Sequence, residues 1–229
     1  MKKMMFTLLL AVIGSMAVSA AQPKIWLLGD GTMAEWGRAF SEHIGNVVEV
    51  RNIAQDGLSV KALEEKGGLD SVIIGKVKKD FLMVQLGQND LNETNVDTYS
   101  SLKAFTQELV ELVHAVQEKK MVVILCTPLA HPYYNDGVLV NRLGGYAEAV
   151  RRVAVSMNVP VIDLEQLSHD WMVNLSEEGV VAYYQNLNTE ERPVGEYLLN
   201  EEGALQIAQM VESSLRQLGN KQLIKALGQ

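Results

Sequence analysis

Residues 81–90 read Phe-Leu-Met-Val-Gln-Leu-Gly-Gln-Asn-Asp, an apolar run that is interrupted once, at Gln85, and stops at a polar loop. A run of this length without polar alternation is typical of a strand that is buried on both faces. The segment 24–32, Lys-Ile-Trp-Leu-Leu-Gly-Asp-Gly-Thr, has the same design. Both segments predict strands of a parallel sheet, each followed at its carboxyl end by a glycine-containing loop.

The remaining chain alternates between short apolar runs and amphipathic stretches with helical spacing. The longest apolar stripe with helical spacing follows Asp97, and either Asp97 or Thr98 is expected to cap the start of that helix. Further strands are expected over 47–53, 121–126 and 159–164, and further helices over 33–44, 141–157 and 202–218. This alternation predicts an α/β fold, with a three-layer α/β/α, flavodoxin-like arrangement around a mostly parallel central sheet.

The composition limits the classes of partner. Twenty basic and 28 acidic residues give a net charge of -8, which argues against a nucleic acid or an anionic membrane surface as the partner. The single cysteine, Cys126, excludes an internal disulfide and a cysteine-based metal cluster, whereas His and carboxylate ligands stay open. No motif indicates a metal site or a cofactor, so we expect neither, and a small-molecule or oligosaccharide ligand fits the composition best.

The first twenty residues are predicted to be a secretory signal peptide. Two lysines precede an apolar run over residues 4–18, which is shorter than the roughly 20 residues that span a bilayer. Small residues then suit cleavage before Ala21, and a retained membrane anchor is the alternative. Cleavage gives an exported protein, periplasmic or secreted, without membrane attachment. Residues 21–229 show no linker or repeat and are expected to form a single domain.

Several loops in this order resemble the sequence blocks of the SGNH (GDSL) hydrolase superfamily, and its rhamnogalacturonan acetylesterase-like branch in particular. The second and third blocks of that family are complete here, as Asn52, Ala54, Gly57 and Ser59 and then Gly87, Asn89 and Asp90. Thr127-Pro128 and the segment 161–164 also match. The resemblance covers almost the whole chain after residue 21, and it implies an ester hydrolase fold.

The first and last blocks depart from the family at its catalytic triad. Where the family has Gly-Asp-Ser-Thr, this chain has Gly31 at the position of the serine nucleophile. When the last block is aligned on Asn200, the family's Asp falls on Gly195 and its His falls on Leu198. The resemblance therefore implies a degenerate triad in which no catalytic residue is intact.

The resemblance also implies that the hydrogen-bond donors of the family's active site remain in this chain. The family holds the negatively charged oxygen of its reaction intermediate with two backbone N–H groups and one side-chain amide, which correspond to Gly31, Gly57 and Asn89 here. Such donors bind a carbonyl or carboxylate oxygen without attacking it. Asp30, Asp90 and His131 follow strand ends and are possible cleft residues, although supporting the loops is the alternative for both aspartates.

These observations predict an exported protein that is not a catalyst and that binds a glycan or acyl group or regulates a partner enzyme. One alternative is a carbohydrate esterase, active on acylated polysaccharide, in which Asp30 or His131 activates water. The other alternative is a purely structural role without a ligand. The remaining histidines, His43, His114 and His169, match no family motif and are expected to be structural.

Overall fold

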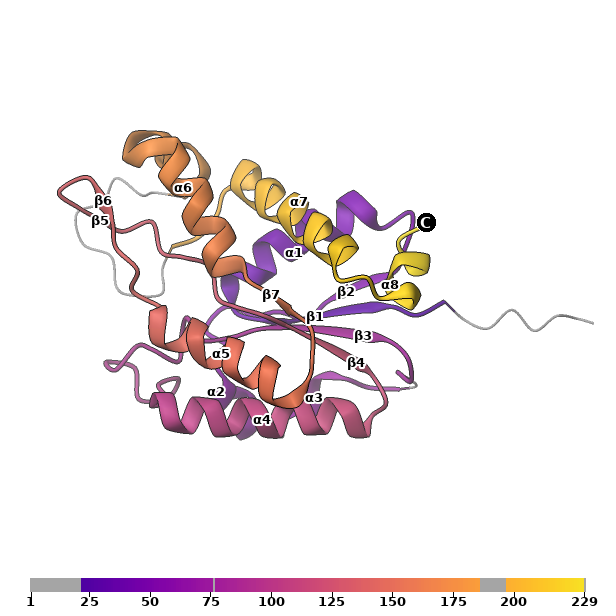
Figure 1. Cartoon of the computed structure of the whole chain (residues 1–229). Coiled ribbons are helices and arrows are strands. Elements are labelled where there is room, and N and C mark those ends of the chain that lie inside the picture. The colour runs from indigo at the N-terminus through magenta and orange to yellow at the C-terminus, as the bar shows by residue number, and fades with distance from the viewer. Residues whose placement is uncertain (1–21, 76, 186–196, 229) are drawn as a thin grey trace, which may run out of the picture.

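The computed structural model describes residues 22–75, 77–185 and 197–228. Its main sheet has five strands in the order β2-β1-β3-β4-β7, and all neighbouring strands are parallel (Figure 1). In this order the strands span Val50–Asn52, Ile25–Gly29, Phe81–Gln85, Val122–Cys126 and Val161–Ile162. Strand β3 lies in the middle and is buried along its whole length, so the predicted central strand is confirmed.

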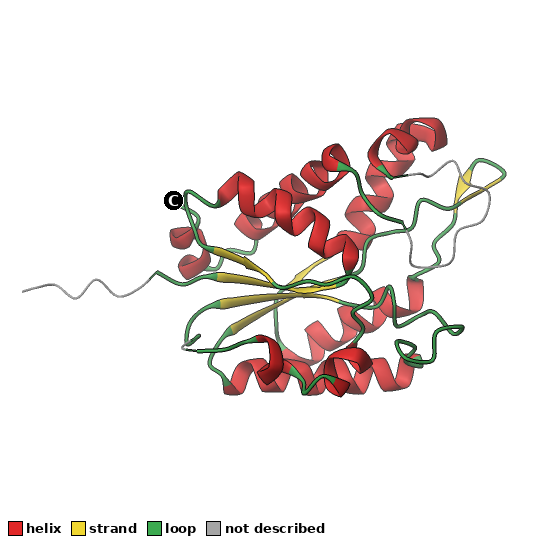
Figure 2. Cartoon of the chain, turned by 180° about the vertical axis from the view of Figure 1, so that it is seen from behind, coloured by secondary structure: helices red, strands yellow, loops and turns green. Residues whose placement is uncertain are grey.

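Helices cover both faces of the sheet, which gives the predicted three-layer α/β/α fold (Figure 2). The first face packs against α1, α6, α7 and α8, which span Gly31–Ile44, Leu164–Val180, Glu201–Gln217 and Lys221–Ala226. The second face packs against α2 to α5, which span Val60–Glu65, Leu69–Val72, Leu102–Glu118 and Gly144–Met157. Each face has its own hydrophobic core.

Helix α1 follows β1 directly because Asp30 ends the strand and caps the helix. The apolar residues of α1 recur every three or four positions, as Met33, Trp36, Phe40 and Ile44, and all four are buried against the sheet and α7. This packing fixes the amino terminus of α1 at the carboxyl edge of the sheet, where ligands bind in open α/β sheets.

Two elements differ in extent from their predictions, and for helix α4 the cause is local. Helix α4 begins at Leu102 with Ser101 as its cap, because the N–H groups of Thr98 and Tyr99 are already held by the Asn95 carbonyl in a turn. Neither Asp97 nor Thr98 caps the helix as predicted. Strand β2 covers only Val50–Asn52 within the predicted range 47–53.

Several elements were not predicted. They are the short helices α2, α3 and α8, helix α6, the 3₁₀ turn η1 over Val181–Tyr183, and a hairpin of β5 and β6 over Tyr134–Asn135 and Val138–Leu139. The hairpin projects beyond the carboxyl edge of the main sheet (Figure 1). No helix in the described ranges is long and apolar enough to cross a membrane.

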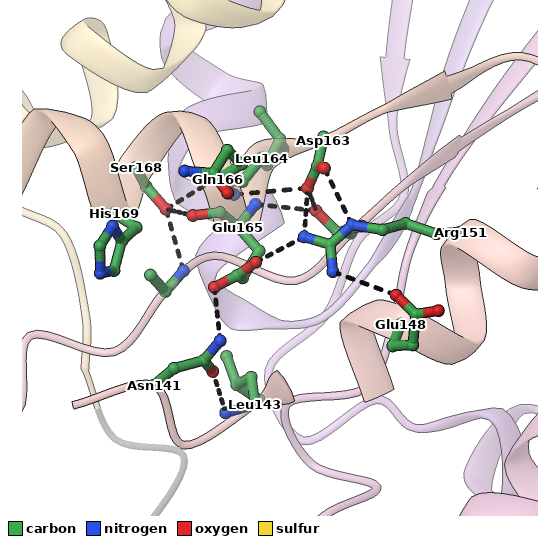
Figure 3. A network of polar contacts seen from close by, with 12 residues as sticks. Asn141, Leu143, Glu148, Arg151, Asp163, Leu164, Glu165, Gln166, Ser168 and His169 are labelled. Atoms are coloured by element: carbon green, nitrogen blue, oxygen red, sulfur yellow. Dashed lines mark hydrogen bonds and ion pairs between the residues drawn. The ribbon is translucent and has the colours of Figure 1, made fainter. Parts of the chain in front are cut away.

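An arginine-centred network joins β7 and α6 to β4 and α5 (Figure 3). The Arg151 guanidinium donates two hydrogen bonds to Asp163, at 2.9 and 2.8 Å, and a third to Glu165 at 2.5 Å. The Thr127 hydroxyl donates to Asp163 and accepts the N–H of Glu165. The Glu165 side chain is only 6% exposed, and Arg151 and the Asn141 amide are its hydrogen-bond partners.

We expect Arg151→Met to lower the free energy of unfolding by about 2–3 kcal/mol, because it leaves the buried Glu165 carboxylate without its cation. Arg152→Met is the matched control, since Arg152 lies next along the same helix and forms only an exposed ion pair with Glu148. The control should lose less than about 0.5 kcal/mol in urea unfolding. Equal losses in the two variants would contradict a structural role for the network.

Candidate functional site

The candidate site lies at the carboxyl edge of the sheet, where the loops after β1, β2 and β3 meet. The Gln55 N–H donates to the Gly29 carbonyl, which joins the second loop to the first. The Asn89 side-chain amide donates to the Leu58 carbonyl at 2.9 Å, which joins the third loop to the second. The sequence blocks that carry the family resemblance are thus brought together in space.

Asp30 supports this site from beneath. Its Oδ1 accepts hydrogen bonds from the N–H groups of Thr32 and Met33, from the Thr32 hydroxyl and from the Gln85 amide. Burial raises the pKa of Asp30 to about 6, and these hydrogen bonds oppose the rise. We expected Asp30 to be a possible cleft residue, but its side chain is only 1% exposed, so its role is to cap α1.

Asp90 has the same supporting role in the third loop. Its two carboxylate oxygens accept the N–H of Val60 and the N–H of Gly87, each at 2.9 Å. Burial raises the pKa of Asp90 to about 7, and these backbone hydrogen bonds lower it in part. The side chain has no exposed surface, so it fixes the loops and does not line a cleft. The loop-supporting alternative for both aspartates agrees with this geometry.

Gly31 opens helix α1, and the carboxylate of Asp56 lies beside it. A β-carbon added at Gly31 would stand 2.8 Å from Asp56 Oδ1, which is closer than real β-carbons approach any atom. Asp56 therefore fills the space that a side chain at residue 31 would occupy. Because Asp56 is exposed, a substitution at residue 31 requires only that this carboxylate rotate away.

Acceptors within the chain hold one of the three donors that the resemblance implied and share a second. The Gly57 N–H donates to Asp56 Oδ1 at 2.9 Å, and one of the two N–H groups of the Asn89 amide donates to the Leu58 carbonyl. Gly57 has a φ of 72°, in the left-handed region that glycine adopts without strain, and this conformation directs the loop.

Glu35 is a site residue that the sequence analysis did not identify. It lies one helical turn after Gly31, and its carboxylate accepts the N–H of Leu199 at 2.6 Å and the Gln185 side-chain amide at 3.3 Å. Burial raises the pKa of Glu35 to about 7, with a further rise from the charge of Asp56 and a decrease from Arg38. The available signal was its spacing of four residues from Gly31, which places both on one face of α1.

The last family block lies against this glutamate. Leu198 is half-buried, and its carbonyl accepts the N–H of Gln185, while Tyr184 and Leu199 form a short antiparallel bridge. The side chain at residue 198 has no titratable group, so it offers no base. Gly195, the position that corresponds to the family's Asp, lies outside the described residues.

His131 lies in the loop after β4 and packs on the ring of Tyr197, with centroids 4.9 Å apart. Its side chain is buried, and neither ring nitrogen has a hydrogen-bond partner in the described structure. Burial lowers the pKa of His131 to about 3, and the nearby charge of Arg142 lowers it further. We expected a possible cleft residue; the structure gives a neutral ring inside the core, which is a weak base at neutral pH.

The other histidines lie on helices, away from the three loops. His43 on α1 forms an ion pair with Glu212 on α7 at 2.9 Å, His114 lies on α4, and His169 lies beside Asp170 on α6. The Thr32 hydroxyl, next to Gly31, is buried between Asp30 and Gln85 and is not available as a nucleophile.

The order of the strands, the cap of α1 and the three interlocked loops define a class of protein: an α/β hydrolytic fold of the SGNH type. A sequence profile of the GDSL-like Lipase/Acylhydrolase family matches residues 17–183. The chain therefore belongs to the GDSL-like lipase/acylhydrolase family.

Curated relatives are from Bacillus subtilis strain 168. The probable rhamnogalacturonan acetylesterase YesY is 28% identical over 206 residues, an alignment that covers 85% of this chain and 93% of YesY. The rhamnogalacturonan acetylesterase RhgT is 26% identical over 213 residues, which cover 86% of this chain and 90% of RhgT.

Solved structures share the fold. The Bacillus subtilis protein YxiM superposes with a TM-score of 0.73 at 22% identity, and the match covers 88% of this chain and 58% of that one. The acetyl xylan esterase AlAXEase superposes with a TM-score of 0.65 at 18% identity, covering 84% and 99% of the two chains. At these identities the structures establish the fold alone.

We expect His131→Phe to raise the free energy of unfolding by about 1 kcal/mol at pH 7, because it removes two buried, unpaired nitrogens and keeps a ring against Tyr197. The stability difference between the variant and the wild type should grow as the pH falls from about 6.5 toward 3. In this range the unfolded wild-type chain binds a proton at His131 that the buried ring does not bind. Urea unfolding across this range measures both effects. A loss of stability in the variant would show that the ring nitrogens have partners.

Glu35→Gln tests the raised pKa of Glu35. Between about pH 4.5 and 7, native Glu35 keeps a proton that the unfolded chain releases, so its contribution to stability decreases as the pH rises through this window. The glutamine variant should show a smaller decrease than the wild type when unfolding is measured at several pH values. Glu118→Gln, at an exposed position on α4, is the control and should follow the wild type. If the free energy of unfolding changed with pH in the same way for Glu35→Gln and the wild type, the raised pKa of Glu35 would be contradicted.

Proposed function

We propose that this protein is an exported, non-catalytic member of its family that binds a glycan or a glycan-linked acyl group. One observation carries the proposal: the residue at the nucleophile position is glycine, and the space beside it is filled by the carboxylate of Asp56. The flanking architecture of the site is kept, because the loops around Gly31, Gly57 and Asn89 remain interlocked.

The polar groups around Gly31 support this proposal. Asp30 and Asp90 are buried and hold backbone N–H groups or the start of a helix. His131 is buried and stays neutral. None of the three has the exposure that activating a water molecule on a bound ester requires. The similar proteins are named as rhamnogalacturonan acetylesterases and an acetyl xylan esterase, so we infer an oligosaccharide of that kind as the ligand.

A second candidate is a carbohydrate esterase that uses a different catalytic group. Glu35 favours it, because this half-buried carboxylate has its pKa raised to about 7 and interacts electrostatically with Asp56, beside Gly31. A carboxylate with such a pKa is suited to act as a general base on water near neutral pH. Donors and substrate binding alone leave about 10³–10⁴-fold catalysis over water in serine proteases that lack their triad.

Acetate release by purified residues 21–229 separates the two candidates. The substrates are an activated aryl acetate and acetylated rhamnogalacturonan. We expect no saturable turnover by the wild type, and no further change in Asn89→Ala or Glu35→Gln. Saturable turnover that either substitution abolishes would contradict the non-catalytic proposal, and loss in Glu35→Gln with retention in Glu118→Gln would identify the base.

A restored triad provides a positive control for the same assay. Gly31→Ser, Gly195→Asp and Leu198→His together replace the three missing side chains. Because the new β-carbon would stand 2.8 Å from Asp56 Oδ1, we expect a higher rate when Asp56→Ala is added to the triple variant. An active triple variant beside an inactive wild type supports the lost triad.

A further inference from the structure

The Gly31 site holds a negatively charged acceptor next to the donors that an acyl carbonyl needs. A carbonyl oxygen only accepts hydrogen bonds, so it requires free donors. The Gly57 N–H is held by Asp56 Oδ1, and one of the two N–H groups of the Asn89 amide is held by the Leu58 carbonyl. An ester that enters this site therefore finds the Gly57 donor already paired and a carboxylate beside it.

The site instead presents acceptors. Asp56 places a carboxylate in the space next to Gly31, and Glu35 adds a second carboxylate one helical turn away. Asp56 is exposed, so its carboxylate is accessible to a ligand. A carboxylate accepts hydrogen bonds and donates none, so it favours a ligand group that carries a donor.

A sugar hydroxyl supplies such a donor, whereas an acetyl ester at the same carbon removes it. Replacement of the hydroxyl hydrogen by an acetyl group also adds a carbonyl oxygen that faces the carboxylates. Hydrogen bonds from hydroxyl groups to carboxylates are short and strong. We propose that this site recognises the free hydroxyl groups of a deacetylated glycan, with Asp56 as the residue that selects hydroxyl over acetyl ester. This inference rests on the proposed function and narrows its ligand to the deacetylated form.

Isothermal titration calorimetry with two matched ligand pairs tests the inference. One pair is acetylated rhamnogalacturonan oligosaccharides and the same preparation after mild alkaline deacetylation. The other pair is acetylated and deacetylated xylo-oligosaccharides, which are uncharged and so separate hydroxyl recognition from uronate charge. We expect the wild type to bind the deacetylated member of at least one pair about tenfold more tightly or better.

Asp56→Ala should weaken binding of that deacetylated ligand about tenfold and bring the two members of the pair to similar affinity. The substitution removes the acceptor and frees the Gly57 N–H for a carbonyl oxygen. Because Asp56 is exposed, the variant should fold, and its thermal unfolding is recorded to check this. Glu118→Ala removes an exposed carboxylate on α4 and should keep the wild-type preference.

The outcomes separate this inference from the proposed function. Tighter binding of the acetylated ligand by the wild type, or an unchanged preference in Asp56→Ala, overturns hydroxyl recognition and leaves a glycan-binding protein. Binding of neither member of either pair, or release of acetate during the titration, overturns the proposed function itself.

Discussion

The buried carboxylate of Asp30 is the interaction on which the site depends. One oxygen atom, Oδ1, receives two backbone N–H groups of α1, the Thr32 hydroxyl and the Gln85 amide. Gln85 is the single polar residue of the central strand, and its side-chain oxygen accepts the indole N–H of Trp36. The end of β1, the start of α1 and the end of β3 are therefore held by one polar cluster inside an otherwise apolar core. Hydrogen bonds are stronger in such a low-dielectric core than in water, so this cluster fixes the three segments relative to one another.

The second and third loops are then placed by hydrogen bonds to their backbones. Asp90 holds Gly87 and Val60, and Asn89 holds Leu58. These contacts depend on the backbone positions of the loops and on no group at residue 31. The scaffold of the site therefore does not require a nucleophile, which explains how the loops stay interlocked around a glycine. A glycine at this position leaves the cap of α1 unchanged because Asp30 supplies it.

The sequence predicted the parts of the structure that depend on local pattern. Apolar runs located β1, β3 and β4, and helical spacing located α1, α4, α5 and α7. Helix α6 was missed because polar residues such as Glu165 and Ser168 are buried in it and contact distant segments, which breaks the apolar stripe. The site residues Glu35 and Asp56 could not be predicted either, since their proximity to Gly31 depends on how α1 and the second loop pack. Burial of His131 likewise results from its contact with Tyr197, 66 positions further along the chain.

Glycine at residue 31 and the position of Asp56 are one feature of the site and not two. A side chain at residue 31 would place its β-carbon 2.8 Å from Asp56 Oδ1, so the carboxylate occupies this space only when the side chain is absent. Once there, it takes the Gly57 N–H, a donor that would otherwise hold an oxyanion. The absence of the nucleophile therefore also removes a donor and adds a negative charge. Charge development on a carbonyl oxygen is disfavoured in such surroundings, whereas a ligand that donates hydrogen bonds is favoured. The same physical change that argues against catalysis thus specifies the kind of group that this site binds.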